Sequence, residues 1–406
     1  MRSNHTLFTI LFTLCWAFVA TVSAKKAKKS TTENIYGKHR LITYIVDWEV
    51  PKDISWDKFD HVAYAFAEPD KDGKLQSFTS SNLKSVVSKA HDNKIGVSIS
   101  VGGWSGSRYF SSLVASDSKR KTLVNNIVSM VDEYGLDGVN LDWEYPNNPD
   151  GLSCNERNAK DTANYLQMVK DLRKSLNTKF PKVHKLITIA VGTSPFNDEN
   201  EKPIKSLDNE WATQVDSYYL MTYDISGDWN EYTGPNSPLK PGKWDSSVQQ
   251  AVQAWNEAGI PKDQLVVGVP FYGTAMKTSQ PVTGSSITVK LAKKSSIKGD
   301  KYDERSADEC TGATVSSSGS YQWRSIKDAG IMKNENGWKV FWDKTSVTPY
   351  AYHAKDKKFL TFDNAKSIKK KADYVVDQHL GGAMIWSLEM DDSKNTLLSS
   401  LQTVRN

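Results

Sequence analysis

Three polar side chains occupy alternate positions in one short apolar stretch. The stretch covers residues 137–146, and Asn140, Asp142 and Glu144 are separated there by apolar residues. Because successive side chains of a strand point to opposite faces, these three share one face. Two carboxylates on a buried strand are costly unless they are paired or hydrogen-bonded. The pattern indicates a carboxylate pair for acid/base catalysis, and a solvated edge strand is the structural alternative.

The residues around this stretch indicate the kind of fold that holds it. Segment 119–134 before it is amphipathic, and Pro146 ends the strand. Val139, Leu141 and Trp143 alternate with the polar residues, so we expect them in the core. A helix followed by an apolar strand is typical of an internal strand in an α/β protein.

The rest of the chain alternates between the two kinds of element. Strands are expected at 41–48, 61–67, 94–100, 137–146, 185–192, 216–224, 265–273 and 382–388. Helices are expected at 81–93, 119–134, 162–176, 246–258 and 368–379. This order predicts the α/β class and a closed (β/α)8 TIM barrel, with a doubly wound open sheet as the alternative. The barrel is favoured because no Gly-x-Gly-x-x-Gly turn opens a helix and several strands end in polar or aromatic residues.

The spacing between the seventh and eighth expected strands is too long for one helix. We interpret 276–343 as a small α+β insertion subdomain, with strand-like pieces at 286–291 and 337–342. Its aromatic residues favour a packed unit, whereas a partly disordered loop is the alternative. These aromatic residues are Tyr321, Trp323, Trp338 and Trp342.

The N-terminus has the features of a targeting segment. Arg2 supplies a charged start, 7–22 is largely apolar, and Val-Ser-Ala at 22–24 offers a cleavage site. We predict a signal peptide over 1–24, a disordered basic lead-in over 25–35 and the catalytic (β/α)8 domain over 36–406. A membrane anchor is the alternative, although the run is short for a spanning helix. The expected product is a secreted, extracellular monomer with no membrane contact after cleavage.

The net charge of +5 comes from this N-terminal region. It contains five basic residues and no acidic one before position 30: Arg2, Lys25, Lys26, Lys28 and Lys29. The remaining chain is neutral, so its charge gives no indication of nucleic-acid binding.

Metal and thiol chemistry have little support in the sequence. No His-Glu-x-x-His motif or cysteine cluster is present, so we expect no metal and no cofactor. A Gly-x-Ser-x-Gly elbow for serine catalysis is also missing. Cys154 and Cys310 remain after removal of the N-terminal segment, and the sequence leaves open whether they pair.

Several motifs in the same order resemble those of the family 18 chitinases, in the larger type with an insertion domain. Asp-Gly-Val-Asn-Leu-Asp-Trp-Glu-Tyr-Pro at 137–146 is similar to the family signature on strand four. Ser-Val-Gly-Gly-Trp at 100–104, Met-Thr-Tyr-Asp at 221–224 and Trp386 resemble the motifs of strands three, six and eight. The chain departs from the family at Asn140, where the signature has an aspartate.

The resemblance implies hydrolysis of the β-1,4 bonds between N-acetylglucosamine units of chitin. It implies a retaining, substrate-assisted reaction, in which the acetamide oxygen of the sugar attacks and forms an oxazolinium ion. Glu144 is implied as the general acid and then the base. Asp142 would hydrogen-bond the acetamide N–H, and Tyr223 and Asp224 would position that group.

The resemblance also implies a set of substrate-binding residues. These are Asn140, Tyr145, Met221, Asp224, Trp104, Trp386 and Tyr44. Trp48 and Trp229 are further candidate sugar platforms, and Tyr272 could face the site. For any single tryptophan outside the motifs core packing is the alternative, and we assign Trp211, Trp244 and Trp255 to structure. Asp137 lies off the parity of the other polar residues and is expected to anchor the strand entrance.

Asn140 has an expected electrostatic consequence. An ionised neighbour raises the pKa of a carboxyl group, and an amide does not. We therefore expect a smaller rise in the Glu144 pKa than an aspartate at position 140 would give. Two other functions stay open: a catalytically weak, lectin-like chitin-binding protein, and an endo-β-N-acetylglucosaminidase acting on N-glycan cores. Expected partners are chitin or N-acetylglucosamine oligomers, with no nucleic acid.

Overall fold

The computed structural model describes residues 40–304, 308–313 and 317–405. The signal peptide and the basic lead-in predicted for 1–24 and 25–35 lie outside these residues. Within them, no helix is both long enough and apolar enough to cross a membrane.

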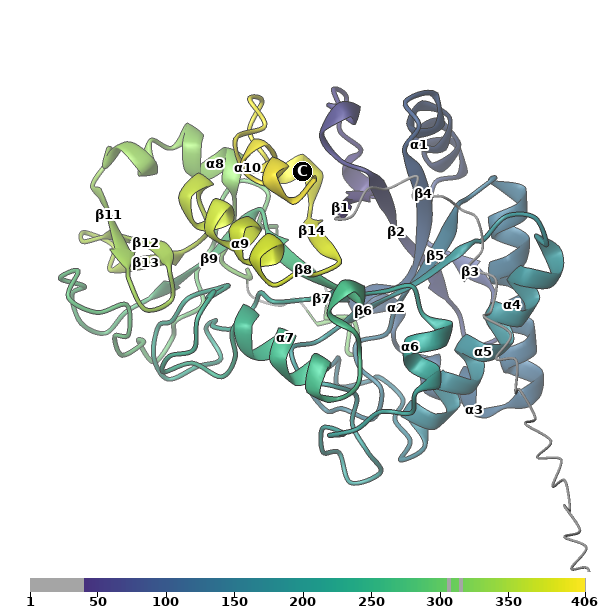
Figure 1. The fold of residues 1–406 in the computed structure, drawn as a ribbon. Helices are drawn as coiled ribbons and strands as arrows, with labels where there is room; N and C mark the ends of the chain where they lie inside the picture. The colour runs from purple at the N-terminus through teal and green to yellow at the C-terminus, as the bar shows by residue number, and fades with distance from the viewer. Residues whose placement is uncertain (1–39, 305–307, 314–316, 406) are drawn as a thin grey trace, which may run out of the picture. The chain divides into compact units, whose positions relative to one another are not determined.

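The described residues contain a barrel of eight parallel strands (Figure 1). In barrel order these are β1 (Arg40–Val46), β2 (His61–Pro69), β4 (Gly96–Gly102), β5 (Gly138–Asp142), β6 (Leu186–Val191), β7 (Ser217–Leu220), β8 (Leu265–Pro270) and β14 (Gly382–Trp386). The short β3 (Leu75–Gln76) adds to β2 in the antiparallel sense. Because β1 pairs with both β2 and β14, the sheet closes on itself. The predicted (β/α)8 barrel is confirmed, and the open doubly wound sheet is excluded.

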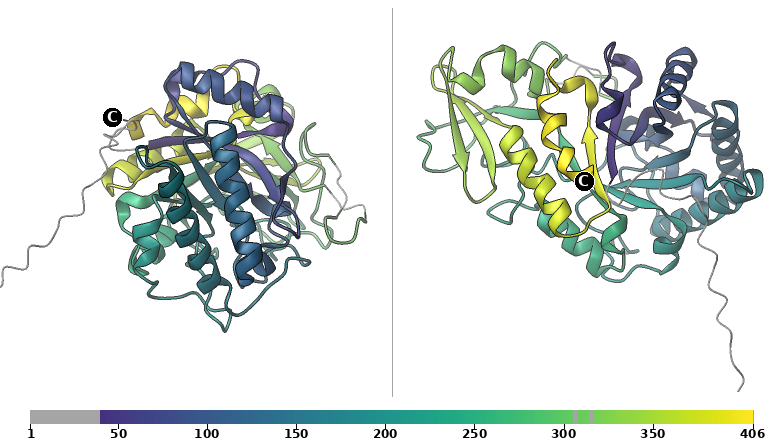
Figure 2. Two further views of the ribbon diagram at one scale, coloured as in Figure 1. Left: turned by 90° about the vertical axis from the view of Figure 1, so that its right-hand side faces the viewer. Right: turned by 45° about the horizontal axis from the view of Figure 1, so that its top comes forward.

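Helices follow most of the barrel strands and lie outside them (Figures 1 and 2). The longer ones are α1 (Ser80–Asp92), α4 (Asp117–Glu133), α5 (Asp161–Lys179), α7 (Val248–Glu257) and α9 (Ala365–Asp377). The shorter ones are α2 (Gly103–Gly106), α3 (Phe110–Ala115), α6 (Glu210–Gln214), α8 (Trp323–Asp328) and α10 (Thr396–Ser400). In α4 the buried residues Leu123, Ile127, Met130 and Val131 recur at helical spacing, so one face packs onto the strands.

Strand alternation divides the core into two parts. Val139 and Leu141 belong to the cluster shared with the helices, as predicted. Trp143 is also buried there and stacks on Phe110, with ring centroids 5.3 Å apart and planes 12° apart. A second cluster, which includes Tyr44, fills the barrel interior. The polar residues of β5 therefore face inward, away from the helices.

An antiparallel sheet interrupts the barrel between β8 and β14, which confirms an insertion between strands seven and eight. Its strands are β9 (Tyr272–Lys277), β10 (Ser320–Gln322), β11 (Trp338–Asp343), β12 (Thr348–His353) and β13 (Lys358–Thr361). The expected range 276–343 contains β10, α8 and β11, whereas β12 and β13 follow it. Segment 286–291 is not a strand and forms only isolated bridges. The expected strand 265–273 is two strands, because the chain leaves the barrel after Pro270.

A disulfide links the insertion to the barrel. Cys154 and Cys310 are bonded, with an S–S distance of 2.14 Å. Cys154 lies in the loop after β5, and Cys310 lies between β9 and β10. The pairing that the sequence left open is therefore present.

We expect Lys371→Met to lower the free energy of unfolding by about 3–5 kcal/mol. Lys371 Nζ lies 2.7 Å from Asp363 Oδ2, and both side chains are buried. Removal of the cation leaves the Asp363 carboxylate buried without its countercharge. The measurement is urea unfolding, with Lys369→Met on the same helix as the control, because Lys369 pairs with Asp373 at the surface. That control is expected to change stability by less than about 1 kcal/mol; equal losses in the two variants would contradict the prediction.

Candidate active site

Asn140 lies in a polar layer across three neighbouring strands. The β4–β5 and β5–β6 registers place Ser100 and Thr188 beside it. The amide Nδ2 of Asn140 donates to Ser100 Oγ at 2.8 Å and to Tyr44 OH at 2.9 Å. Its Oδ1 accepts a hydrogen bond from Thr188 Oγ1 at 2.9 Å. The side chain is fully buried, and these hydrogen bonds fix its orientation.

Asp142 lies next to this layer, at the carboxyl end of β5. Its Oδ2 accepts a hydrogen bond from Tyr44 OH at 3.3 Å. Its Oδ1 has no hydrogen-bond partner among the described residues, although the side chain is almost completely buried. An unpaired buried carboxylate oxygen is costly, so this atom is suited to accept an N–H from a bound molecule.

Glu144 lies two residues further on and is partly exposed. Its carboxyl group lies close to the side chains of Asp142 and Tyr145, which both act on its pKa. Burial raises the pKa of Glu144 well above its usual range, and the negative charge of Asp142 raises it further. Burial also raises the pKa of Asp142, although the hydrogen bond from Tyr44 favours its ionised form. The negative charge of Asp142 thus favours the protonated form of Glu144, which suits a general acid.

The backbone of Glu144 is held by two residues that the sequence motifs do not indicate. Ser107 Oγ accepts the Glu144 N–H at 2.8 Å and donates to the Gly103 carbonyl at 2.7 Å. Asn155 Nδ2 donates to the Glu144 carbonyl at 2.8 Å. Neither residue shares an element with Glu144, so strand parity gives no signal for them.

Asp224 and Tyr272 form a second polar group at the same end of the barrel. Tyr272 OH donates to Asp224 Oδ1 at 2.6 Å. The surrounding protein limits hydration and raises the pKa of Asp224, whereas the Tyr272 hydrogen bond lowers it. Burial is the main reason that the pKa of Tyr223 is raised, and the negative charges of Asp142, Asp224 and Glu144 raise it further. These four side chains therefore lie close together. Tyr223 thus joins the predicted carboxylates, and Tyr272 faces them.

Aromatic rings form a continuous series beside the carboxylates. Trp386 contacts Tyr44, with ring centroids 5.1 Å apart, and stacks on Phe66 at 5.7 Å. Phe66 in turn stacks on Trp48 at 6.3 Å, and Trp48 is 67% exposed. Met221, Tyr223 and Trp386 are partly buried against the barrel interior. The structure therefore brings most of the predicted residues together, and it adds Phe66, for which no motif in the sequence provides a signal.

Two predicted platforms lie further out. Trp104 in α2 is 45% exposed, and Trp229 in the loop after β7 is 65% exposed. Exposed tryptophan faces are available to pack against the apolar faces of sugar rings. In contrast, Trp211 and Trp255 are fully buried, as predicted for structural residues.

Asp137 lies apart from these groups, at the entrance of β5. Its Oδ2 accepts hydrogen bonds from the Val97 N–H at 2.8 Å and from His91 Nε2 at 2.8 Å. It anchors the strand entrance, as expected from its parity. Among the described residues, no cluster of His, Cys, Asp and Glu has the geometry to hold a metal ion.

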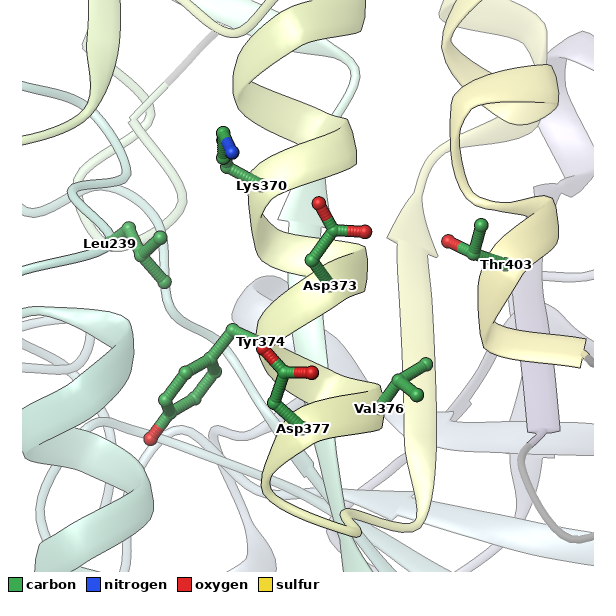
Figure 3. A pocket seen from close by; sticks show the side chains of 7 residues that line it. All are labelled: Leu239, Lys370, Asp373, Tyr374, Val376, Asp377 and Thr403. Atoms are coloured by element: carbon green, nitrogen blue, oxygen red, sulfur yellow. The ribbon is translucent and has the colours of Figure 1, made fainter.

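A separate surface pocket is found at α9 and includes none of the predicted site residues (Figure 3). It is lined by Leu239, Lys370, Asp373, Tyr374, Val376, Asp377 and Thr403. Charged side chains of both signs surround it, so it differs in character from the aromatic and acidic end of the barrel.

The model of the glycosyl hydrolases family 18 matches residues 40–391. The chain belongs to this family. It is a glycoside hydrolase of the large type of family 18 chitinase, with an antiparallel insertion sheet between barrel strands. The match covers the strands, the carboxylates and the aromatic residues described above.

Individual relatives agree with this membership. The crystal structure of a chitinase from Rhizomucor miehei is 50% identical, with a TM-score of 0.88, and the match covers 91% of this chain and 100% of that one. A chitinase-like effector from Moniliophthora roreri is 34% identical over 83% of this chain and 85% of its own. A catalytic domain of the Ostrinia furnacalis Group II chitinase, solved as a mutant with a penta-N-acetylated chito-oligosaccharide, is 28% identical with a TM-score of 0.72. That match covers 90% of this chain and 96% of the other.

Proposed function

We propose that this family 18 enzyme hydrolyses β-1,4 linkages between N-acetylglucosamine units of chitin by a retaining, substrate-assisted reaction. One observation carries the proposal: the Glu144 carboxyl lies beside Asp142, whose charge raises the Glu144 pKa and whose buried Oδ1 has no hydrogen-bond partner among the described residues. One acid that retains its proton and one buried acceptor are what the reaction requires of the protein. The chitin-oligomer complex of the Ostrinia furnacalis relative supports this substrate class.

In the first step Glu144 would donate its proton to the leaving glycosidic oxygen. Its raised pKa favours retention of this proton until the leaving oxygen takes it. The acetamide oxygen of the sugar would attack the anomeric carbon, and its N–H would point to Asp142 Oδ1. The carboxylate of Asp142 would then stabilise the positive oxazolinium ion. Glu144, now ionised, would take a proton from the water that opens this ion, which returns both groups to their starting state.

The remaining predicted residues would bind and orient the sugar. Tyr223 and Asp224 would hold the acetamide group, and Met221 would pack beside it. Trp386 would form the apolar floor, and Trp104 would support the next sugar. Tyr44 would orient Asp142 through its hydrogen bond, and Asn140 would orient Tyr44 in turn. Tyr145 would act on Glu144, its neighbour in the chain, because it favours the ionised form of that carboxyl group.

We also propose that the chain is a secreted, extracellular monomer, with a signal peptide over 1–24, a basic lead-in over 25–35 and one catalytic domain over 36–406. The disulfide between Cys154 and Cys310 supports this compartment, because disulfides persist under oxidising conditions. The proposed partners are chitin and N-acetylglucosamine oligomers, without nucleic acid.

A chitin-binding protein with weak catalysis is the second candidate, and the neutral Asn140 favours it. The endoglycosidase on N-glycan cores is the third. Colloidal chitin and an N-linked glycoprotein, each incubated with the purified chain, distinguish the three. Soluble N-acetylglucosamine oligomers released from chitin alone support the proposal. Chitin that is bound without release supports the binding protein, and glycan released from the glycoprotein alone supports the endoglycosidase.

Asn140→Asp is expected to move the alkaline limb of the pH–rate profile to higher pH. A second carboxylate beside Asp142 would add negative charge near Glu144, and negative charge raises the pKa of a carboxyl group. Activity is lost when Glu144 loses its proton, so a higher pKa extends activity upwards. The measurement is kcat/KM against pH on a soluble oligomer, with Asn140→Ala as an uncharged control. An unchanged profile and rate in the aspartate variant would refute this electrostatic role.

A further inference from the structure

Asn236 lies in the loop after β7 and is buried to 1% exposure. It accepts hydrogen bonds from two successive backbone N–H groups, one at the last residue of the Met-Thr-Tyr-Asp motif and one at the residue after it. The Asp224 N–H donates to Asn236 Oδ1 at 3.1 Å, and the Ile225 N–H donates to the Asn236 carbonyl at 3.0 Å. These bonds surround a residue with unusual backbone geometry, because Asp224 has a φ of 56°. A non-glycine residue in this left-handed region persists only where its surroundings hold it there.

Asn236 is held in turn by the insertion sheet. Its backbone N–H donates to Thr361 Oγ1 at 2.8 Å, at the end of β13. Its Nδ2 approaches the Tyr272 carbonyl at 3.5 Å, at the start of β9. The Tyr272 hydroxyl returns to Asp224 Oδ1 at 2.6 Å, which closes a ring of contacts around the Asp224 carboxylate. The position of Asp224 is therefore tied to two strands outside the barrel.

The next residue provides a second connection to the same motif. Ser237 Oγ donates to the Thr222 carbonyl at 2.5 Å and accepts from Lys371 Nζ at 2.6 Å. Thr222 precedes Tyr223, and its own hydroxyl donates to the Gly268 carbonyl of β8 at 2.7 Å. The backbone on both sides of Tyr223 is thus fixed by residues 236–237.

We propose that Asn236 is a positioning residue for the reaction. Through its hydrogen bonds, the position of the insertion sheet determines where Asp224 and Tyr223 lie. It has no room to touch a sugar, since it is buried, and it acts through the backbone of the motif. The inference rests on the proposed function, because Asp224 and Tyr223 matter only if they orient an acetamide group. It gives the insertion a role in turnover that is separate from any contact with substrate.

Asn236→Ala should lower kcat on a chitin oligomer by about 10- to 100-fold, because displacement of an orienting group by about 1 Å can have an effect of this size. KM should change less than kcat, since the aromatic platforms remain. The control is Asn126→Ala on the outer helix α4, which removes a side-chain hydrogen bond from Asn126 to the Gly73 carbonyl. Melting temperatures of both variants are measured beside the kinetics.

A second pair of variants keeps the test decisive if Asn236→Ala does not fold. Thr361→Val removes the acceptor for the Asn236 N–H at nearly constant volume, whereas Thr361→Ser keeps a hydroxyl there. We expect the valine variant to lose kcat and the serine variant to recover most of it. Loss of melting temperature with wild-type kcat, in Asn236→Ala or in Thr361→Val, would overturn the inference. A wild-type enzyme without activity on chitin would instead overturn the proposed function.

Discussion

Glu144→Gln is expected to lower kcat on chitin oligomers by about 10²–10⁴-fold, the usual contribution of a positioned general acid. Glutamine keeps the size of the side chain and its hydrogen-bonding capacity towards Asp142, but it has no proton to give to the leaving oxygen. Binding should survive, because the aromatic residues are unchanged. The measurement is the initial rate of oligomer hydrolysis together with the dissociation constant of the same oligomer.

Glu389→Gln is the matched control for this result. Burial raises the pKa of Glu389 to about 7, and its Oε1 accepts a hydrogen bond from Ser387 Oγ at 2.5 Å. It is therefore a second glutamate with a raised pKa, but the charges that act on it are those of Glu49 and Arg324. We expect Glu389→Gln to retain most of the activity. Retention of wild-type kcat in Glu144→Gln would exclude Glu144 as the acid.

Asp142→Asn is expected to have the second largest effect, a loss of about 10²–10³-fold in kcat, in the range measured for removal of one group that stabilises a charged transition state. An amide at this position cannot offer a negative charge to the oxazolinium ion. The same substitution should lower the pKa of Glu144, because the charge of Asp142 raises it. The alkaline limb of the remaining activity should therefore move to lower pH, which a profile of kcat/KM measures.

Asp137→Asn provides the control within the same motif. Asp137 accepts hydrogen bonds from Val97 and His91 at the strand entrance, away from the reacting groups. Its replacement is expected to reduce stability without a shift of the alkaline limb. If the two variants shift the limb equally, the effect of Asp142 does not come from its proximity to Glu144.

Strand parity and order were enough to predict the barrel and the central carboxylates. The two-residue repeat of side chains along a strand predicts that Asn140, Asp142 and Glu144 share one face. It could not predict their partners, because Ser100 and Thr188 depend on which strands pair and in which register. In the sequence Phe66 has the features of an ordinary strand residue. It stacks on Trp386 only because the barrel closes.

The insertion was harder to delimit for a physical reason. In the barrel most strands are apolar and are followed by a helix, which is a repeated signal. In the insertion, β12 and β13 pair with neighbours by antiparallel contacts, and no helix separates them. The chain also passes from β8 into β9 with one residue between them, so an apolar run of 265–273 looks like a single strand. The role proposed for Asn236 depends on this junction and has no sequence motif of its own.

The most direct test of the account is the anomeric configuration of the first product. Proton NMR during hydrolysis of an N-acetylglucosamine hexamer distinguishes the two anomers before they equilibrate. We expect the β-anomer to form first, because attack by the acetamide and then by water inverts the anomeric carbon twice. Initial formation of the α-anomer would contradict it, because a single displacement by water would then replace the step assigned to the acetamide and Asp142.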